Sequence, residues 1–471
     1  MTAAQQQLIE RLRGELGPGG VIDDPADIAP WLTDWRGRYH GASPVLLAPG
    51  STAEVQAVVR GAAALGVPLV PQGGNSGMVG GATPPADGSA LLVSLRRLNR
   101  VRAIDRSARL MVAEAGCILQ NVHEAALEQG LRFPLTLGGK GSATIGGLVS
   151  TNAGGTQVLK FGTMRSLVLG IEAVLPDGTL HDGLTPLKKD NRGPSFDQLL
   201  CGAEGTLGIV TAATLRLYPA VAERAVAWIG VADPFRALEL LRMMQVRTDR
   251  VEGFEIVPAD TLGHVLEHIP GTRAPLAAAH RWNVLVEATV DGPGDSPAAL
   301  LEALLGEGLE RGLVEDAVLA GSEAQAEAFW KLRDSISEAE RATGPAAQHD
   351  ISVPVDDMPR FLVEGAAEVE RAFPGVEASG FGHLGDGNIH FHVRAAARQG
   401  PDWYEREAPA VSRLVHDLVT AAGGSISAEH GIGQMKRDEL ARLSPGRVAA
   451  LRALKAGLDP QGLFNPGKLV R

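Results

Sequence analysis

The sequence predicts an α+β protein with a glycine-rich first domain and a second domain built on an antiparallel sheet. Three observations support this. The chain has 471 residues, which is longer than a domain with a single hydrophobic core usually is. Short strands and helices alternate in the first half, where glycine clusters. After Pro219 glycine becomes rarer, and strand–helix–strand units follow. We expect three parts, 1–219, 220–424 and 425–471.

The composition is that of a globular protein and narrows the classes of partner. There are 44 Lys and Arg against 55 Asp and Glu, a net charge of −11, which argues against a general binder of nucleic acid or anionic membranes. The two cysteines, Cys117 and Cys201, are too few for a disulfide framework. No signal-peptide pattern and no apolar stretch of the ~20 residues that span a bilayer are present. We therefore expect a cytoplasmic protein without a membrane span.

Hydrophobic periodicity predicts the elements of each half. In the first half it predicts helices at Thr52–Leu65 and Cys117–Gln129, a glycine-rich loop at 134–155, and strands at Val45–Ala48, Val67–Val70, Ala90–Leu95, Arg109–Glu114, Leu167–Leu175 and Gly208–Tyr218. In the second half it predicts strands at Val226–Val231, Phe254–Val257, Trp282–Thr289 and Val314–Leu319, and helices at Pro234–Val246, Ala298–Arg311, Ala324–Arg341, Val355–Phe373 and Glu405–Ala422. Such repeated strand–helix–strand units are typical of an antiparallel sheet covered by helices.

The first glycine cluster, residues 71–84, reads P-Q-G-G-N-S-G-M-V-G-G-A-T-P and follows a predicted strand directly. Small residues allow backbone N–H groups to curl around a pyrophosphate. The spacing follows neither G-x-G-x-x-G nor a P-loop, which disfavours a Rossmann dinucleotide fold and a nucleotide hydrolase. A glycine-rich surface loop is the alternative interpretation of this cluster alone.

Two further glycine clusters weigh against a plain surface loop. Residues 137–155 read L-G-G-K-G-S-A-T-I-G-G-L-V-S-T-N-A-G-G, and residues 202–211 read G-A-E-G-T-L-G-I-V-T. With three such motifs in this order, the chain resembles the FAD-binding family of vanillyl-alcohol oxidase and p-cresol methylhydroxylase (PCMH). It is most similar to the branch of D-lactate, glycolate and D-2-hydroxyglutarate dehydrogenases, and the resemblance extends to Lys468.

The resemblance implies a cofactor and the residues that line it. It implies a PCMH-type FAD-binding domain of two α+β subdomains, followed by a cap domain for the substrate. It also implies that the C-terminal segment, 425–471, returns to the first domain. The implied FAD-binding residues are Pro71, Gly73, Gly74, Asn75, Ser76, Gly77, Gly80, Gly81, Leu137, Gly138, Gly141, Ser142, Thr144, Gly146, Gly147, Asn152, Gly154, Glu204, Gly205, Ile209 and Asn465. Some relatives attach FAD through a histidine or cysteine in these loops. Neither occurs between 71 and 84 or between 130 and 160, so we expect non-covalent FAD.

Histidines gather in the last quarter of the chain. Residues 383–390 read H-L-G-D-G-N-I-H, so a glycine turn separates His383 from His390 on the strand that leaves it. Residues 427–430, S-A-E-H, add a carboxylate beside another histidine. Two imidazoles, one carboxylate and an open position make a usual catalytic zinc set, whereas a single histidine is more often structural.

The resemblance assigns roles in this region. It implies that His383, His390 and Glu429 bind a divalent metal, with zinc expected. His430 is then the catalytic base, and Asn388 faces the substrate. The metal would bind the substrate's oxygens and bring the hydroxyl proton within reach of a histidine base near neutral pH, while hydride passes to the flavin.

A small anionic 2-hydroxy acid needs a cation to bind its carboxylate. Residues 330–337, W-K-L-R-D-S-I-S, have a helical pattern that places Arg333 and Ser337 four apart on one face. The resemblance implies that Arg333 binds the substrate carboxylate and that Ser337 assists, and a solvated helix arginine is the alternative. D-2-hydroxyglutarate is the first choice of substrate, and D-lactate or a similar acid is the next.

Several polar residues keep more than one interpretation. Gln348 stands where the family strand usually begins with lysine, which weakens the case for a second, distal carboxylate in the substrate. Arg38 and Lys436 are candidate substitutes for that cation. His392 either supports the site or faces solvent, and His416 is interpreted as structural.

Three other functions compete with a metal-assisted D-2-hydroxy acid dehydrogenase. A metal-free FAD oxidase of alcohols or sugars would not need the two histidines and the later Glu-His pair. A non-catalytic FAD electron-transfer component would not need a hydride-transfer site. A zinc hydrolase would leave three glycine motifs without a role. The resemblance also implies an electron-transfer flavoprotein or a quinone as electron acceptor, and it leaves a homodimer open.

Overall fold

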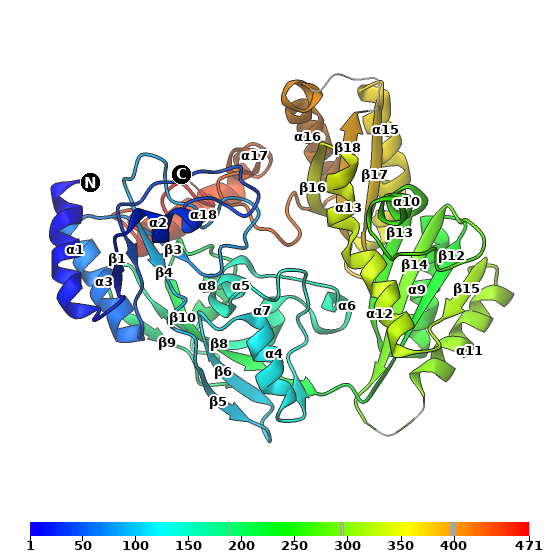
Figure 1. Ribbon diagram of the computed structural model, residues 1–471, viewed down its shortest axis with the longest axis horizontal. Coiled ribbons are helices and arrows are strands. Elements are labelled where there is room, and N and C mark those ends of the chain that lie inside the picture. The colour runs from blue at the N-terminus through cyan, green and yellow to red at the C-terminus, as the bar shows by residue number, and fades with distance from the viewer. Residues whose placement is uncertain (188, 293, 295, 396–401, 471) are drawn as a thin grey trace. The chain divides into compact units, whose positions relative to one another are not determined.

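A computed structural model of the chain describes residues 1–187, 189–292, 294, 296–395 and 402–470 (Figure 1). The chain divides into two compact units, each with a hydrophobic core of its own. Unit 1 comprises Met1–Gly155, Gly162–Ala220 and Glu429–Arg471, and unit 2 comprises Thr156–Phe161 and Val221–Ala428. The C-terminal segment therefore belongs to the same unit as the N-terminus.

The first sheet of unit 1 is partly parallel. Its strands are β1 (Val21–Ile22), β2 (Leu46–Leu47), β3 (Leu69–Gln72) and β4 (Leu91–Ser94), in the order β1-β2-β4-β3. β4 pairs in parallel with both β2 and β3. Helix α3 (Thr52–Leu65) connects β2 to β3 and packs against α1 (Ala3–Glu15). The bounds of α3 are those predicted, because the Ser51 side chain caps its first turn and Gly66, with φ 63°, ends it.

The second sheet of unit 1 is antiparallel throughout. Its strands are β5 (Val101–Asp105), β6 (Leu110–Glu114), β8 (Val168–Val174), β9 (Leu180–Asp182) and β10 (Ile209–Arg216), in the order β5-β6-β10-β8-β9. The remaining elements here are α2 (Pro25–Ile28), η1 (Ala29–Trp31), α4 (Leu119–Leu127), β7 (Leu131–Arg132), α5 (Ile145–Thr151), α7 (Met164–Leu167), α8 (Phe196–Leu200) and β11 (Tyr218–Pro219). The prediction of a loop over all of 134–155 was wrong, because α5 lies within it. Ile145, Leu148 and Val149 form the buried face of α5, at a helical spacing that the surrounding glycines obscure.

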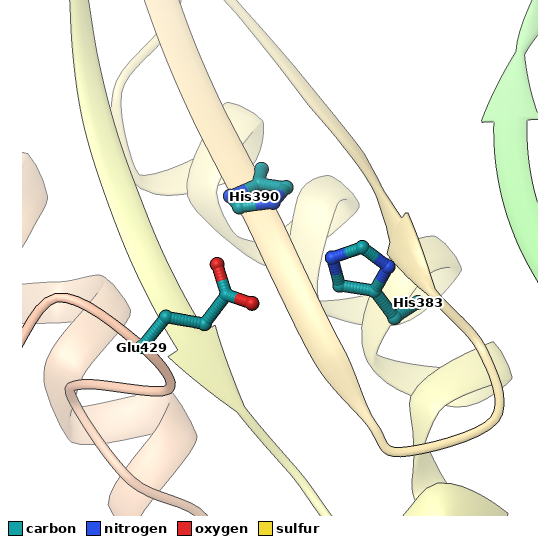
Figure 2. A group of neighbouring side chains, drawn as sticks. All are labelled: His383, His390 and Glu429. Carbon is teal, nitrogen blue, oxygen red and sulfur yellow. The ribbon is translucent and has the colours of Figure 1, made fainter. Parts of the chain in front are cut away.

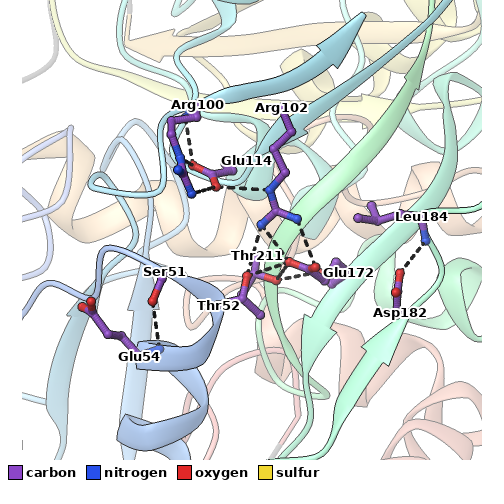
Figure 3. Close-up of polar contacts among 10 residues, drawn as sticks. All are labelled: Ser51, Thr52, Glu54, Arg100, Arg102, Glu114, Glu172, Asp182, Leu184 and Thr211. Carbon is purple, nitrogen blue, oxygen red and sulfur yellow. Dashed lines mark hydrogen bonds and ion pairs between the residues drawn. The ribbon is translucent and has the colours of Figure 1, made fainter. Parts of the chain in front are cut away.

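A network of charged side chains joins this sheet to α3 (Figure 3). Nε of Arg102 lies 3.1 Å from Oε1 of Glu114, and its Nη2 lies 3.0 Å from Oε1 of Glu172. The hydroxyl groups of Thr52 and Thr211 each donate to Oε1 of Glu172 at 2.7 Å. Side chains from four elements, α3, β6, β8 and β10, thus take part in one network around the guanidinium of Arg102.

The C-terminal segment completes the core of unit 1. It contains α17 (Arg437–Leu443) and α18 (Pro445–Leu458). Phe464 is fully buried and forms a parallel bridge with Leu69, the first residue of β3. Nζ of Lys455 donates to the carbonyl oxygen of Phe464 at 2.7 Å and holds this last turn in place.

Unit 2 is built on one antiparallel sheet, as predicted. Its strands are β12 (Glu223–Val231), β13 (Val251–Pro258), β14 (Trp282–Val290), β15 (Asp316–Leu319), β16 (Ala346–Ser352), β17 (Val376–His383) and β18 (Asn388–Ala395), in the order β15-β12-β14-β13-β17-β18-β16. One face packs against α9 (Pro234–Arg247), α11 (Pro297–Glu310), α15 (Ala366–Ala372) and α16 (Trp403–Ala421). The other face packs against α10 (Ala259–His268), α12 (Glu323–Asp334) and α13 (Ile336–Thr343). A short helix, α6 (Val158–Phe161), also belongs to unit 2.

Two long helices predicted for unit 2 are interrupted. Ser335 separates α12 from α13, and its backbone N–H donates to the carbonyl oxygens of Lys331 and Arg333. The other predicted helix changes type along its length, as η2 (Val355–Asp357), α14 (Met358–Arg360), η3 (Phe361–Gly365) and α15 follow one another. Pro359, which has no backbone N–H to donate, lies within this second interruption. None of the helices in the described part of the chain has the length and apolar character that crossing a bilayer demands.

Candidate functional site

Two glycine loops of unit 1 are packed tightly against each other. A Cβ built on Gly73 would lie 2.2 Å from Oγ1 of Thr144, and one on Gly74 would lie 1.8 Å from the carbonyl oxygen of Ser142. Side chains do not tolerate such distances, so only glycine at these two positions permits the approach. The structure thus brings together the first and the second of the predicted FAD motifs.

Other glycines of the same loops face open space. A Cβ on Gly77 or Gly138 would have no neighbouring atom within 4 Å, and one on Gly141 would come no closer than 3.7 Å to another residue. The buried Oγ1 of Thr144 has no hydrogen-bond partner among the described residues. Small residues with exposed backbone and an unsatisfied hydroxyl form a cradle that a phosphate-bearing cofactor can fill. The residues present therefore suit FAD.

Glu204 anchors the third motif to the C-terminal segment of unit 1. Its Oε1 accepts the N–H of Ile432 and its Oε2 accepts the N–H of Gly433, both at 2.7 Å. Nδ2 of Asn465 donates to the carbonyl oxygens of Glu204 and Gly81, at 2.7 and 2.9 Å. Burial raises the pKa of Glu204, although the two backbone N–H groups act in the opposite direction. These bonds fix the position of the segment that also carries the predicted base.

All of the residues implied to bind FAD lie in unit 1. Some of them serve the loops themselves. Asn152 ends α5 with φ 50°, and its Oδ1 accepts the N–H of Arg165 at 2.9 Å. Gly205, with φ 70°, packs against Pro71, since a Cβ there would lie 2.6 Å from Cγ of that proline. The side chain of Asn75 donates to the carbonyl oxygen of Thr33 at 2.8 Å.

In unit 2 the hairpin of β17 and β18 places two imidazoles side by side. His383 is the last residue of β17, and His390 pairs with Phe381 across the hairpin, so the two histidines are diagonal neighbours on one face. Their ring centroids are 5.9 Å apart. Gly387, with φ 81°, makes the turn between the strands, and a Cβ at this position would lie 2.1 Å from the carbonyl oxygen of Val353.

The three predicted metal ligands come together. Donor atoms of His383, His390 and Glu429 all lie within 4.8 Å of one another. Glu429 directly follows Ala428, the last residue of unit 2, so its backbone continues from that unit. Figure 2 shows its carboxylate directed toward the imidazoles. Two ring nitrogens and a carboxylate oxygen suit Zn²⁺ and related divalent ions, so these residues fit a metal.

A second acidic group adjoins this one. Potential ligand atoms of Asp350, Glu429 and His430 lie within 4.8 Å of one another. Asp350 is buried on β16 opposite His390, and its Oδ1 accepts a hydrogen bond from Nδ2 of Asn388 at 3.0 Å. The buried Oδ1 of Asn388 has no partner among the described residues. The predicted base and the predicted substrate residue Asn388 are therefore both placed around Asp350.

Arg333 reaches the site, but not in the way predicted. The helix is interrupted at Ser335, so the prediction that Arg333 and Ser337 share one face of a continuous helix was wrong, and Ser337 is exposed. Nε of Arg333 donates to Oε2 of Glu255 at 2.8 Å, and its Nη2 lies 3.4 Å from Nε2 of His383. The guanidinium thus stands beside one of the three candidate metal ligands.

A cluster around Glu340 of α13 lies on the same sheet face. Its two oxygens accept hydrogen bonds from Nδ1 of His264 and Nδ1 of His392, both at 2.9 Å, and it forms an ion pair with Arg394. Burial raises the pKa of Glu340, but His392, His264 and Arg394 together lower it to about 2. His392 is therefore buried and bonded, and the interpretation that it faces solvent was wrong. Gln348 lies opposite His392 on β16.

Sequence reasoning missed three buried acids near these groups, namely Glu255, Glu340 and Asp350. Burial alone raises the pKa of Glu255, but His383 and Arg333 lower it to about 2. A carboxylate is rarely buried unless it is paired. Glu255 could have been found from the sequence, because it lies between two apolar residues of the predicted strand F-E-I-V, where a charged side chain needs a partner.

The chain matches two family descriptions. Residues 43–183 match "FAD binding domain", and residues 221–469 match "FAD linked oxidases, C-terminal domain". A solved structure of p-cresol methylhydroxylase is similar, with a TM-score of 0.76 at 14% identity over 100% of this chain and 97% of that one. A structure of alkyldihydroxyacetonephosphate synthase has a TM-score of 0.75 at 16% identity over 98% of this chain and 84% of that one. These two show the fold, which is the two-domain PCMH type that the sequence predicts.

Curated relatives are more similar in sequence. The D-2-hydroxyglutarate dehydrogenase of Xanthomonas citri pv. viticola is 37% identical and covers 95% of this chain and 93% of its own length. The mitochondrial D-2-hydroxyglutarate dehydrogenases of Bos taurus and Arabidopsis thaliana are 36% and 35% identical, over 96% and 97% of this chain and 81% and 80% of their own lengths.

The cradle of glycine loops on a PCMH-type fold defines a class, the FAD-dependent oxidoreductases. Within that class the match extends over both units. The chain belongs to the family of FAD-linked oxidases that includes the D-2-hydroxyglutarate dehydrogenases.

Proposed function

We propose that this chain is a FAD-dependent dehydrogenase that oxidises a small D-2-hydroxy acid to the 2-oxo acid with the help of a divalent metal. The observation that carries the proposal is the group of His383, His390 and Glu429, whose donor atoms lie within 4.8 Å of one another in a FAD-linked oxidase. The relatives are named for D-2-hydroxyglutarate, which is therefore our first choice of substrate, with D-lactate or a similar acid next.

Each group of the site has one part in this reaction. His383, His390 and Glu429 would hold the metal, which supplies a Lewis acid that lowers the pKa of a bound hydroxyl. Bound FAD supplies the acceptor for the hydride that leaves C2 of the substrate. His430 takes the hydroxyl proton, so that the acid loses one hydride and one proton in all. Arg333 binds the substrate carboxylate and fixes the orientation of C2.

The side chain of the substrate is the least constrained part of the proposal. Gln348 offers an amide where the resemblance expects a lysine, so a distal carboxylate would gain a hydrogen bond without an ionic attraction. We therefore expect D-2-hydroxyglutarate to remain a substrate and its advantage over D-lactate to be modest. An electron-transfer flavoprotein or a quinone is the electron acceptor that we propose.

Anaerobic flavin reduction tests the proposed reaction. The FAD-loaded chain is mixed with the D- and L-forms of 2-hydroxyglutarate and lactate, and the visible flavin absorbance is followed. We expect the D-forms alone to reduce the flavin, a chelator to prevent the reduction, and added Zn²⁺ to restore it. Full reduction after chelation would favour a metal-free oxidase, and no reduction by any acid would favour an electron-transfer component.

His430→Ala tests the assignment of the base. The variant should keep FAD and metal but reduce flavin roughly 10²- to 10⁴-fold more slowly, because the hydroxyl proton then has no positioned acceptor. His268→Ala, at the end of α10, is the matched control and should react like the wild type. Normal flavin reduction by the His430→Ala variant would show that another group is the base.

A further inference from the structure

The carboxylate of Glu255 contacts two groups of the proposed site at once. Glu255 lies on β13 directly opposite His383 of β17, and its side chain is buried. Its Oε1 lies 2.5 Å from Nδ1 of His383, and its Oε2 accepts the Nε–H of Arg333 at 2.8 Å. One oxygen therefore serves a candidate metal ligand, and the other serves the candidate substrate cation.

These contacts select one tautomer of His383. A guanidinium can only donate hydrogen bonds, and Nη2 of Arg333 lies 3.4 Å from Nε2 of His383, which favours a lone pair on Nε2. An ionised carboxylate can only accept, so the ring proton sits on Nδ1 and points to Glu255. Both neighbours thus favour the same arrangement, in which Nε2 is the nitrogen that can bind a cation.

We propose that Glu255 is a positioning residue that fixes Nε2 of His383 for the metal and holds Arg333 beside it for the substrate carboxylate. The inference rests on the proposed function and names the residue that sets the spacing between its two binding groups. Carboxylates that orient metal-bound histidines commonly contribute 10- to 100-fold to metal affinity. A single rigid carboxylate would also keep the carboxylate of the substrate at a constant distance from the metal.

The same strand provides a matched control. Glu252 is also a fully buried glutamate of β13, three residues away, and its Oε1 lies 2.9 Å from Nζ of Lys160 and 2.5 Å from Oγ1 of Thr289. Lys160 and Thr289 are not residues of the proposed site. Glu252→Gln therefore removes a buried negative charge from the same strand, as Glu255→Gln does, but leaves the residues around His383 unchanged.

Zinc titration of the full FAD-loaded chain tests the inference. Zn²⁺ alone is titrated against a chromophoric chelator, with wild type, Glu255→Gln and Glu252→Gln compared. A glutamine at 255 can accept from His383 or from Arg333, but not from both. We expect the zinc Kd of the Glu255→Gln variant to rise 10- to 100-fold, and that of Glu252→Gln to stay within about threefold of wild type. The KM for the hydroxy acid should also rise in Glu255→Gln.

A tautomer measurement gives a readout that does not depend on activity. In ¹⁵N-histidine-labelled, metal-free protein, His383 should show a protonated Nδ1 in the wild type and a shift toward the Nε2-protonated form in Glu255→Gln. Wild-type zinc affinity in Glu255→Gln would overturn this inference while leaving the proposed function intact. A wild-type chain that binds no zinc would overturn the metal-assisted function and this inference together, and a protonated Nε2 in the wild type would overturn this inference alone.

Discussion

At the scale of single residues, the glycines of the FAD loops fall into two groups that a sequence cannot separate. Gly74 is required by the protein, because a Cβ there would lie 1.8 Å from the carbonyl oxygen of Ser142, whereas a Cβ on Gly77 would meet nothing within 4 Å. Gly74→Ala should therefore push the two loops apart and lower the free energy of unfolding by roughly 1–3 kcal/mol, with loss of FAD binding. Thermal unfolding of the FAD-free chain measures the first effect, and fluorescence titration with FAD measures the second.

Gly77→Ala provides the comparison at the same scale. It should leave the melting temperature of the FAD-free chain unchanged and weaken FAD binding about tenfold, or about 1.4 kcal/mol, because the added methyl group would occupy the cradle. Equal melting temperatures for the Gly74→Ala variant and the wild type would contradict the packing argument. The motif G-G-N-S-G predicts that the backbone comes close to another group. Only the position of the second loop, some seventy residues later in the sequence, shows which glycine makes this contact.

At the scale of secondary-structure elements, the Arg102 network of unit 1 (Figure 3) makes stability depend on pH. Burial raises the pKa of Glu114 and Glu172. Arg100 and Arg102 outweigh this effect at Glu114, and Arg102 with two threonine hydroxyls outweighs it at Glu172, so both folded pKa values lie below the ordinary 4.5. A carboxyl of this kind stabilises the fold fully above its unfolded pKa and loses that contribution as the pH falls toward its folded pKa. The stability of unit 1 should therefore decrease from about pH 5 downward.

Arg102→Ala tests this dependence. Removing the guanidinium leaves two buried carboxylates with one partner fewer, so the free energy of unfolding at neutral pH should fall by roughly 3 kcal/mol. The same change should make stability less sensitive to pH below about pH 5, because the pKa of each carboxyl then no longer lies so far below its unfolded value. Urea unfolding at several pH values measures both effects. Arg192→Ala breaks an exposed pair with Asp190 and should leave the urea unfolding curve unchanged at every pH.

Hydrophobic periodicity predicts some of the helices well and others poorly. Helix α3 was predicted to the residue, since its start and end are coded locally by Ser51 and Gly66. The break at Ser335 was not, because the helical spacing of apolar residues continues from α12 into α13 across it. The contacts of Arg333 with Glu255 and His383 were not predicted either, because they depend on strands far away in the sequence.

At the scale of the whole molecule, the return of the C-terminal segment to unit 1 depends on partners far away in sequence. Glu204 binds the N–H groups of Ile432 and Gly433, more than two hundred residues later. No local pattern encodes such a pair, and the resemblance to a known family was the only source of that prediction. The candidate metal ligands have a local signal, because His383 and His390 flank a short turn and Glu429 adjoins His430, but their roles were assigned by the resemblance.

The separate cores of the two units make unfolding in two steps the expected behaviour, and Phe464 tests it. This side chain is fully buried in the core of unit 1, although it lies seven residues from the end of the chain. Phe464→Ala should cost unit 1 about 3–5 kcal/mol through lost burial and the cavity left behind. In differential scanning calorimetry one transition should move to lower temperature, by about 2–4 °C for each kcal/mol, while the other stays in place. Phe235→Ala, which truncates a side chain that is 46% exposed on α9 of unit 2, should move neither. A single transition that shifts as a whole would show instead that the two cores unfold together. FAD release, measured during the same scan, would then coincide with that single transition.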